Sequence, residues 1–413
     1  MNKQLLASTA LVAAGMLMAP SMASAAGKTV KLGLHGYMEQ LVGVAFDRSD
    51  SESTLTRAES TTSFDQMTES EIHFKGSGKL DNGITIIADV QLEVSGSPGN
   101  IIDEQYMIIR GGFGQLTLGS EDNAGHLMTI GYSGSWATGV GQSLTFDPAD
   151  WITLANGINA GARFDGTLND VRLRSVDNDS SKISYFTPRF SGFQVGASYI
   201  PNFQQQTAVA LGGSVAGKSA LYHEGWALGA NYTGKFSGVG VGVAVGYLTA
   251  ESSGAQSATV ENTTNRTFKN DDDMSALSGA IRIDFGGFRV AAAMKRNEDV
   301  VNGAGGVGNG AFSTRSLDGV IFDIGARYKM GAHMMSLGYR QGRMEGEVGG
   351  GNEEEKAFMA SYARNLGAGV KWHANLMHSD TEDDHRGAAL VNGKSDISGW
   401  AMSTGLRQIG RAS

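Results

Sequence analysis

The chain has 413 residues, a net charge of −9, 59 glycines, 5 prolines and no cysteine. The acidic balance excludes a nucleic-acid partner that is bound through a basic surface. Because there are no disulfides, an exported chain of this length has to be held together by its hydrogen-bonded scaffold.

The first 25 residues have the pattern of a secretory signal peptide. One positive charge precedes the almost wholly apolar run Leu5–Ala19, and Ala23-Ser24-Ala25 is an A-x-A cleavage site. The apolar run is too short to span a membrane, and no later run approaches the ~18 residues that a spanning helix needs. We therefore expect residues 1–25 to be removed on export, leaving residues 26–413 as a single domain.

The remaining chain is dominated by a two-residue period. In "VKLGLHGYME" (Val30–Glu39), apolar or small residues alternate with Lys31, His35, Tyr37 and Glu39. Alternation of this kind is typical of strands with one apolar and one polar face. Counting such segments predicts about sixteen antiparallel strands, near residues 28–46, 64–80, 84–95, 102–110, 115–119, 181–188, 192–200, 224–235, 238–250, 273–285, 288–298, 315–329, 333–345, 355–365, 369–380 and 394–407.

The connections between these strands alternate in length. Turns such as Asp81-Asn82-Gly83 and Gly286-Gly287 are short, and the longest connection is the stretch 120–180. Short turns at one end and long loops at the other predict a transmembrane β-barrel with periplasmic turns. Aromatic residues near the turns fit an interfacial girdle: Phe113, Phe190, Phe193, Phe236, Phe285, Phe288 and Tyr328. A soluble β-sandwich, the competing interpretation, would need two domains for sixteen strands.

Four stretches in order resemble alphaproteobacterial general outer-membrane porins of the Rhodobacter type. They are "YMEQLVGVAF" (Tyr37–Phe46), "SEIHFKGSGKLDNGITIIADVQLE" (Ser70–Glu93), "DEQYMIIRGGFGQLTLGSEDNA" (Asp103–Ala124) and "SYFTPRFSGFQVGASYIPN" (Ser184–Asn202). The resemblance implies a sixteen-stranded homotrimer of outer-membrane barrels in a Gram-negative bacterium. It also implies that the third long loop, here residues 120–165, folds into the lumen and narrows the pore.

The same resemblance implies that loop carboxylates face basic residues of the wall. The loop candidates are Glu121, Asp122, Asp147, Asp150 and Asp165. The wall candidates on early strands are Lys31, His35, His73 and Lys75, with Arg110 added if its side chain points inward. Later strands offer Arg282, Arg289, Lys295, Arg327, Arg340 and Lys371. The competing interpretation is that most of these are solvated lumen residues, which barrels tolerate.

Catalysis has no support in the sequence. Gly131-Tyr132-Ser133-Gly134 is one residue short of the G-x-S-x-G elbow, and His223-Glu224 lacks the second histidine of H-E-x-x-H. We expect no enzyme and no cofactor. Calcium has hard oxygen ligands in Asp177-Asn178-Asp179 and Asp271-Asp272-Asp273, but solvated turn acids are the preferred interpretation because neither tract meets the full calcium-loop pattern.

The sequence therefore predicts a general diffusion porin that forms a water-filled channel for small hydrophilic solutes and ions. A substrate-specific channel and a structural or adhesive outer-membrane barrel remain the alternatives. Besides membrane lipid, the expected partners are two further copies of the chain, which would bury the aliphatic faces of 84–92 and 115–118. One departure from the family is the C-terminus, which ends Gln408-Ile409-Gly410-Arg411-Ala412-Ser413 without the usual aromatic residue.

Overall fold

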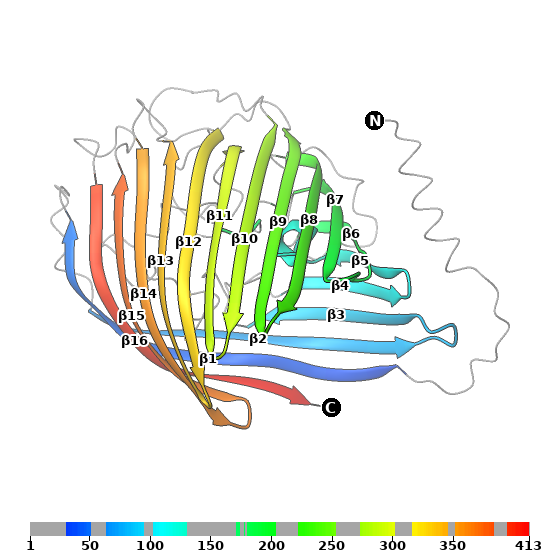
Figure 1. Cartoon of the computed structure of the whole chain (residues 1–413), viewed down its shortest axis with the longest axis horizontal. Coiled ribbons are helices and arrows are strands. Elements are labelled where there is room, and N and C mark those ends of the chain that lie inside the picture. The colour runs from blue at the N-terminus through cyan, green and yellow to red at the C-terminus, as the bar shows by residue number, and fades with distance from the viewer. Residues whose placement is uncertain are drawn as a thin grey trace.

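The protein folds as a closed barrel of sixteen antiparallel strands (Figure 1). Each strand pairs with its neighbours in sequence, and β16 closes the barrel against β1. This computed structural model describes residues 30–50, 63–94, 102–129, 171–173, 177, 180–203, 222–252, 273–301, 316–345, 352–383 and 395–412. The predicted antiparallel barrel of about sixteen strands is confirmed, whereas the signal peptide predicted at residues 1–25 and most of the predicted lumen loop lie outside the described residues.

The elements follow the predicted order. They are β1 Lys31–Asp50, β2 Phe64–Lys79, β3 Thr85–Glu93, β4 Ile102–Gly111, β5 Gly114–Ser120, α2 Ala124–Leu127, β6 Ser181–Phe186, β7 Phe193–Asn202, β8 Tyr222–Phe236, β9 Val239–Ser252, β10 Met274–Phe285, β11 Phe288–Val301, β12 Ser316–Met330, β13 His333–Glu345, β14 Asn352–Gly367, β15 Val370–Asp383 and β16 Ser395–Ala412. In the described ranges, no helix has the length and hydropathy to cross a membrane.

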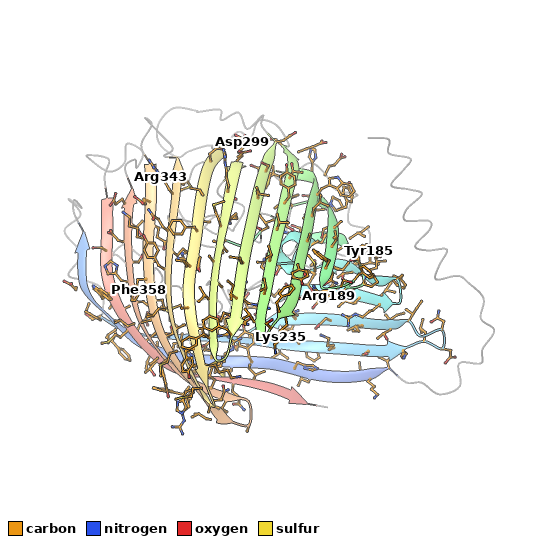
Figure 2. All side chains as sticks on the ribbon, in the orientation of Figure 1. Tyr185, Arg189, Lys235, Asp299, Arg343 and Phe358 are labelled. Atoms are coloured by element: carbon orange, nitrogen blue, oxygen red, sulfur yellow. The ribbon has the colours of Figure 1, made fainter. Side chains whose placement is uncertain are left out.

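Side chains alternate between the two faces of the wall (Figure 2). On β9, Val243, Val245 and Tyr247 are exposed, whereas Ala244 and Gly246 between them are buried. The exposed row forms the outer face, which meets lipid, and the alternate row faces the lumen. This two-residue period allows one strand to present apolar side chains to lipid on one face and polar side chains to the lumen on the other.

Strand β16 extends five residues beyond its predicted end at residue 407 and reaches Ala412. Ala412 lies opposite Leu34 of β1, so the last residues of the chain complete the seam of the barrel. The alternation of a single strand ends where its own apolar residues end, but pairing continues as long as the partner strand offers free backbone groups. Closure therefore sets the length of β16.

The hairpin between β4 and β5 depends on a glycine. Gly114 has a φ of +114°, and a Cβ at this position would lie 2.2 Å from the carbonyl oxygen of Phe186. Only glycine fits both the backbone conformation and the close approach of β6. The short strands β5 and β6 lie on either side of the long connection that includes α2.

Aromatic rings gather on the outer face near the short turns of the later strands. Phe193 and Tyr232 have ring centroids 4.7 Å apart, and Phe288 lies 5.5 Å from Phe285 and 4.4 Å from Tyr328. Such contacts join neighbouring strands at the depth expected for a membrane interface. The predicted girdle residues in this part of the wall therefore lie on one face and at one end of the barrel.

Candidate functional site

The first residues after β5 lie against the lumen-facing side of the wall. The short helix α2 packs against β6, β7, β8 and β9. The backbone N–H of Ala124 donates to Ser198 Oγ at 2.8 Å, and Asn231 Nδ2 donates to the carbonyl of Met128 at 2.8 Å. Ala124 comes so near β8 that a Cβ on Gly229 would lie 2.4 Å from its carbonyl oxygen. Residues 124–128 are therefore anchored inside the barrel.

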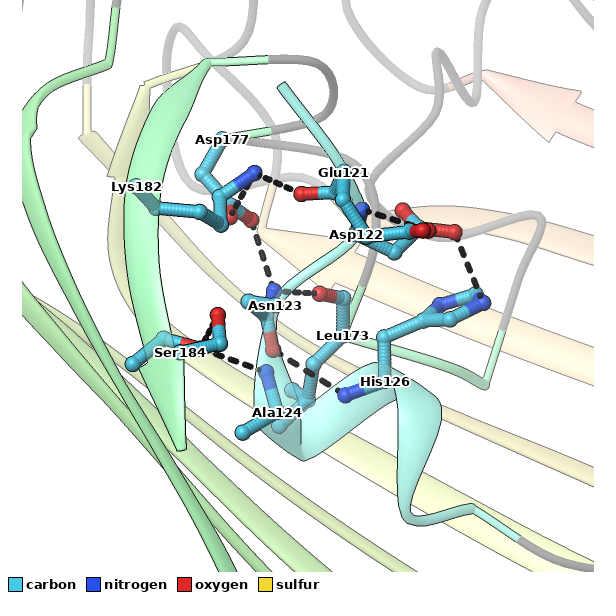
Figure 3. Close-up of polar contacts among 10 residues, drawn as sticks. Glu121, Asp122, Asn123, Ala124, His126, Leu173, Asp177, Lys182 and Ser184 are labelled. Atoms are coloured by element: carbon cyan, nitrogen blue, oxygen red, sulfur yellow. Dashed lines mark hydrogen bonds and ion pairs between the residues drawn. The ribbon is translucent and has the colours of Figure 1, made fainter. Parts of the chain in front are cut away.

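Asn123 ties the start of this connection to its end (Figure 3). Its Oδ1 accepts from the N–H of His126 at 3.0 Å, which caps α2. Its Nδ2 donates to Asp177 Oδ1 at 2.8 Å and to the carbonyl of Leu173. The side chain is fully buried, and an unsatisfied buried amide would cost about 1–3 kcal/mol. These bonds therefore fix two segments that are about fifty residues apart in sequence.

Lys182 of β6 neutralises the buried end of the connection. Its Nζ lies 3.3 Å from Asp177 Oδ2 and also donates to the carbonyl of Glu121. Both charged side chains are buried, with exposed fractions of 1% and 0%. Burial raises the pKa of Asp177 to about 6, although the Lys182 charge acts in the opposite direction. The pair is therefore held by geometry in a place where an isolated charge would be costly.

Three carboxylates meet at the mouth of this connection. Oxygen atoms of Glu104, Glu121 and Asp122 lie within 4.8 Å of one another. Burial, followed by the Asp122 charge, raises the pKa of Glu121 to about 7. His126 Nε2 lies 3.2 Å from Asp122 Oδ2. These oxygens have ligand chemistry that suits calcium, while Asn178, Asp179, Asp271 and Asp272 of the two predicted tracts lie outside the described residues.

The end of the connection packs on apolar residues of the adjoining lumen wall, on β9–β11. Val171 joins a buried cluster with the small residues Ala244, Ala280 and Ala293, and Leu173 joins a second cluster that includes Leu248. Lys295 Nζ donates to the carbonyl of Arg172 at 3.3 Å. Small side chains on β9–β11 thus leave room for residues 171–173. The predicted loop acids Asp147, Asp150 and Asp165 lie outside the described residues, so their place in the pore stays a prediction.

The early strands bring two of the predicted basic residues next to carboxylates. Lys75 Nζ lies 2.7 Å from Asp89 Oδ2, and His73 Nε2 lies 2.9 Å from Glu71 Oε2. Arg110 points to the lumen side and donates to the Gln115 side chain at 2.6 and 3.1 Å. Lys31 and His35 have the same parity as His73 and so share the lumen face. The structure therefore groups four of the five around β1–β3.

The carboxylates of this wall were missed as site residues. Tyr37 Oη lies 2.9 Å from a carboxylate oxygen of Glu69 and 2.9 Å from one of Glu71. Glu39 lies 2.7 Å from His373 Nε2 across the seam. Their alternation with outward residues was visible in the sequence, since Glu39 and Glu71 share the polar face with His35 and His73. Counting both signs of charge on that face would have identified an acidic wall.

The later strands carry most of the lumen-facing arginines. Arg282 and Arg289 share Asp284, at 2.9 and 2.6 Å, and Arg340 lies 3.0 Å from Glu355. Further cations on the same face are Arg327 of β12, Lys371 of β15 and Arg407 of β16. The described lumen therefore has an acidic side on β1–β3 and a basic side on β10–β16.

Comparison with known proteins agrees with this architecture. A family model described as "Gram-negative porin" matches residues 7–384. No curated protein matches by sequence. Among solved structures, the trimer form of OmpT from Vibrio cholerae is 12% identical, with 92% of this chain and 100% of that chain covered and a TM-score of 0.57. An anion-selective porin from Comamonas acidovorans is 14% identical, with 93% and 100% covered and a TM-score of 0.51.

The structural likeness at these identities supports the barrel fold, and the family match covers most of the chain. The closed wall, the polar lumen and the lipid-facing outer row are what a channel through an outer membrane requires. The chain therefore belongs to the Gram-negative porin family and is a diffusion channel of the outer membrane.

Proposed function

We propose that this porin is a general channel for small hydrophilic solutes and ions, and that residues 120–165 narrow it. The observation that carries the proposal is the anchoring of both described ends of the β5–β6 connection on lumen-facing residues, at Ala124–Met128 and at residues 171–173. Irregular backbone at membrane depth is tolerated where it lines water or packs on protein. The resemblance to Rhodobacter-type porins, which also suggests a lumen loop, rests on four sequence stretches between the start of β1 and the end of β7.

Deletion of about half of 130–165 tests the constriction. The wall is held by pairing among sixteen strands that lie in the described ranges, so the barrel should assemble without these residues. Single-channel conductance should rise and larger uncharged solutes should pass. Unchanged conductance and an unchanged size limit in an assembled barrel would place the segment outside the pore. Because the experiment measures transport directly, it also distinguishes a channel from a structural barrel or an enzyme.

We further propose a homotrimer whose interface uses β16 and β1–β5. The outer face of this side exposes aliphatic residues such as Leu34, Met38, Met107 and Leu406, together with the rings of Phe46, Phe64 and Phe74. In the described ranges, no ring pair joins neighbouring strands among β1–β5, whereas such pairs join β7 to β8 and β10 through β11 to β12. A face with isolated rings among aliphatic residues can be buried against another copy of the chain. Cross-linking in mild detergent should yield trimers, and a mass that corresponds to monomer alone would contradict the proposal.

Weak cation preference is the third part of the proposal. The chain carries 42 acidic residues against 33 lysines and arginines, and the early lumen wall is acidic. Reversal potentials across a salt gradient measure this preference. A marked anion preference would show that the basic wall of the later strands dominates the field instead.

A further inference from the structure

We propose that the lumen wall from β12 to β16 contains a binding site for the oxyanion groups of solutes in transit, formed by Arg327, Ser361, Lys371 and Arg407. The inference rests on the proposed function as a general channel and deepens it by naming a class of solute. Its basis is a group of cations and polar donors that have few counterparts of opposite charge.

Arg327 and Lys371 stand apart from the other lumen cations. Within the described ranges, no carboxylate oxygen lies within ion-pair distance of either side chain, whereas Arg289 and Arg340 each have one. The Nε–H of Arg327 is buried and has no acceptor among the described residues. An unsatisfied buried donor costs about 1–3 kcal/mol. An oxyanion at this place would supply both the missing acceptor and the missing charge.

The strand register places these residues in two rows of the lumen wall. Arg327 lies opposite Ser336, and Ser336 lies opposite Ser361, whose partner on β15 is Asn375. Lys371 lies further along β15, opposite Asn365 on one side and Arg407 on the other. Neighbouring strands are about 4.8 Å apart and residues about 3.3 Å apart along a strand, so the backbones of Arg327 and Lys371 are separated by about 14 Å across the sheet and about 13 Å along it. Their long side chains reach across this separation, because the charge of Lys371 interacts with those of Arg327, Arg407 and Glu39.

Small hydroxyl residues occupy the wall between the cations. Ser336 and Ser361 each have an exposed fraction of 6%, and Ser361 Oγ has no partner among the described residues. A buried hydroxyl without a partner is a donor that a bound oxyanion can use. Both serines lie in the same row of the wall as Arg327, so the Ser361 hydroxyl belongs to the Arg327 side of the site.

Arg407 completes the site without neutralising it. Its Nη1 lies 3.6 Å from Glu39 Oε2, but Glu39 also lies 2.7 Å from His373, and Arg407 Nε has no acceptor among the described residues. Glu39 also acts on Lys371, and Asp284 acts on Arg327 while it pairs with Arg282 and Arg289. The cations of this region therefore outnumber its carboxylates, which leaves net positive charge. The guanidinium forks match the planar or tetrahedral oxygens of carboxylate and phosphate.

This site is compatible with a pore that prefers cations overall. The carboxylates of Glu69, Glu71 and Asp89 lie on β2 and β3, and they border a different part of the lumen from β12–β15. Charges of opposite sign on separate parts of the wall give each kind of ion its own favourable surface. Conduction requires that binding be weak enough for release, so millimolar affinity is sufficient for selective passage.

The test uses the complete mature chain in planar bilayers, with inorganic phosphate and succinate as separate probes. In about 0.1 M KCl, where the Debye length is about 10 Å, millimolar amounts of a bound probe should lower the single-channel chloride current. The double variant Arg327→Gln/Lys371→Gln should weaken the apparent affinity for the probe by about tenfold or more, since charge-assisted hydrogen bonds are lost. The probe with the stronger effect identifies the preferred oxyanion.

A charge-matched control is Lys79→Gln/Lys235→Gln, which removes two cations of lumen-facing parity on β2 and β8. This control should keep the wild-type response to phosphate and succinate. Equal losses in the two double variants, or a wild-type channel that responds to neither probe, would overturn the site. A wild-type chain without any ion conductance would instead overturn the channel, and the site with it.

A conservative variant keeps the test decisive if the double variant fails to assemble. Arg327→Lys retains the charge but loses the planar fork, so it should weaken the response to the probe while KCl conductance persists. An unchanged response in this variant would show that Arg327 does not bind the oxyanion.

Discussion

On β2 and β3, His73 and Lys75 lie within ion-pair distance of Glu71 and Asp89, whereas on β12 and β15 Arg327 and Lys371 have no such carboxylate in the described ranges. The acidic side therefore neutralises part of its charge through Lys75 and Asp89 on adjacent strands, and His73 contacts Glu71 within β2. The basic side also contains ion pairs, at Arg282, Arg289 and Arg340, but Arg327 and Lys371 have none among the described residues. This difference indicates that these two cations, rather than the whole basic side, are available to solutes.

The contrast follows from strand register rather than from composition. Lys75 lies directly opposite Asp89, so their side chains meet on the same face. Arg327 lies opposite Arg289 on one side and Ser336 on the other, so no carboxylate can reach it from a neighbouring strand. The charges of a few residues that lie opposite one another on neighbouring strands therefore decide the role of each part of the wall. Where the charges are opposite, the residues form ion pairs; where they are not, the charged side chains are available to bind solutes.

The largest expected effect comes from uncoupling the buried pair that holds the end of the β5–β6 connection. Lys182→Met leaves Asp177 buried without its cation, and breaking one partner of a buried pair costs about 3–5 kcal/mol. Thermal unfolding in detergent, or proteolysis of residues 121–129, should show the loss. The double variant Lys182→Met/Asp177→Leu should recover most of it. Equal stability of the single and double variants would contradict a role for the ion pair.

The fold could be predicted almost completely from the sequence, because alternation along each strand is a local signal. The stretch Val30–Glu39 shows one lumen face and one lipid face without any knowledge of its neighbours. The end of β16 could not be predicted, since Ala412 is in a strand only through its pairing with Leu34.

The candidate site was predicted less well for a related reason. The lumen parity of Lys31, His73 and Lys75 follows from alternation, but the partners of these residues depend on register between strands. Asn123 and Asp177 are 54 residues apart in sequence, and nothing local indicates that their side chains meet. Tertiary contact of this kind is set by packing inside the barrel.

A change of pH tests the attachment of the β5–β6 connection to the lumen wall, with a smaller expected effect than the Lys182 substitution. Glu121 faces Glu104, Asp122, Tyr106 and Lys182, and burial raises its pKa to about 7, while the pKa of Asp177 rises to about 6. The anchored state therefore binds more protons than a released state between about pH 4 and 7. Anchoring should weaken as the pH rises through this window, by on the order of 1–3 kcal/mol.

Hydrogen exchange of the amides in residues 124–128, corrected for intrinsic rates, measures this pH effect. Protection should be higher at the acidic end of the window than above it. Glu121→Gln cannot ionise, so it should flatten the part of the pH dependence that Glu121 contributes. Protection that rises with pH in the wild-type chain would contradict the assignment.

Tyr37 lies where the acidic and basic sides meet, and it allows their contributions to be separated. Its hydroxyl contacts Glu69 and Glu71, and Arg407 lies over its ring at 4.3 Å from the centroid. Tyr37→Phe keeps the ring and removes the hydroxyl contacts, which should cost about 1–3 kcal/mol of unfolding free energy because the acceptors are charged. Tyr37→Leu also removes the cation–π contact, which adds about 0.5–1 kcal/mol. Equal unfolding free energies for the two variants would show that the ring contributes nothing.

The smallest expected effect is on ion preference, and it compares the two sides directly. Glu69→Gln/Glu71→Gln removes negative charge from the acidic wall with little change in side-chain size. A unit charge about 10 Å from a permeating ion in water is worth about 0.4 kcal/mol, or about twofold in local ion concentration. The cation preference measured by reversal potential should therefore fall by about this factor for each charge. Arg327→Gln, which removes one positive charge from the opposite wall, should raise the preference by a similar factor. Both effects should fade in concentrated salt, where the Debye length falls to about 3 Å at 1 M. If the two variants shifted the reversal potential in the same direction, the walls would not act on ions through their own charges, and the division of the lumen into an acidic and a basic side would have no role in selectivity.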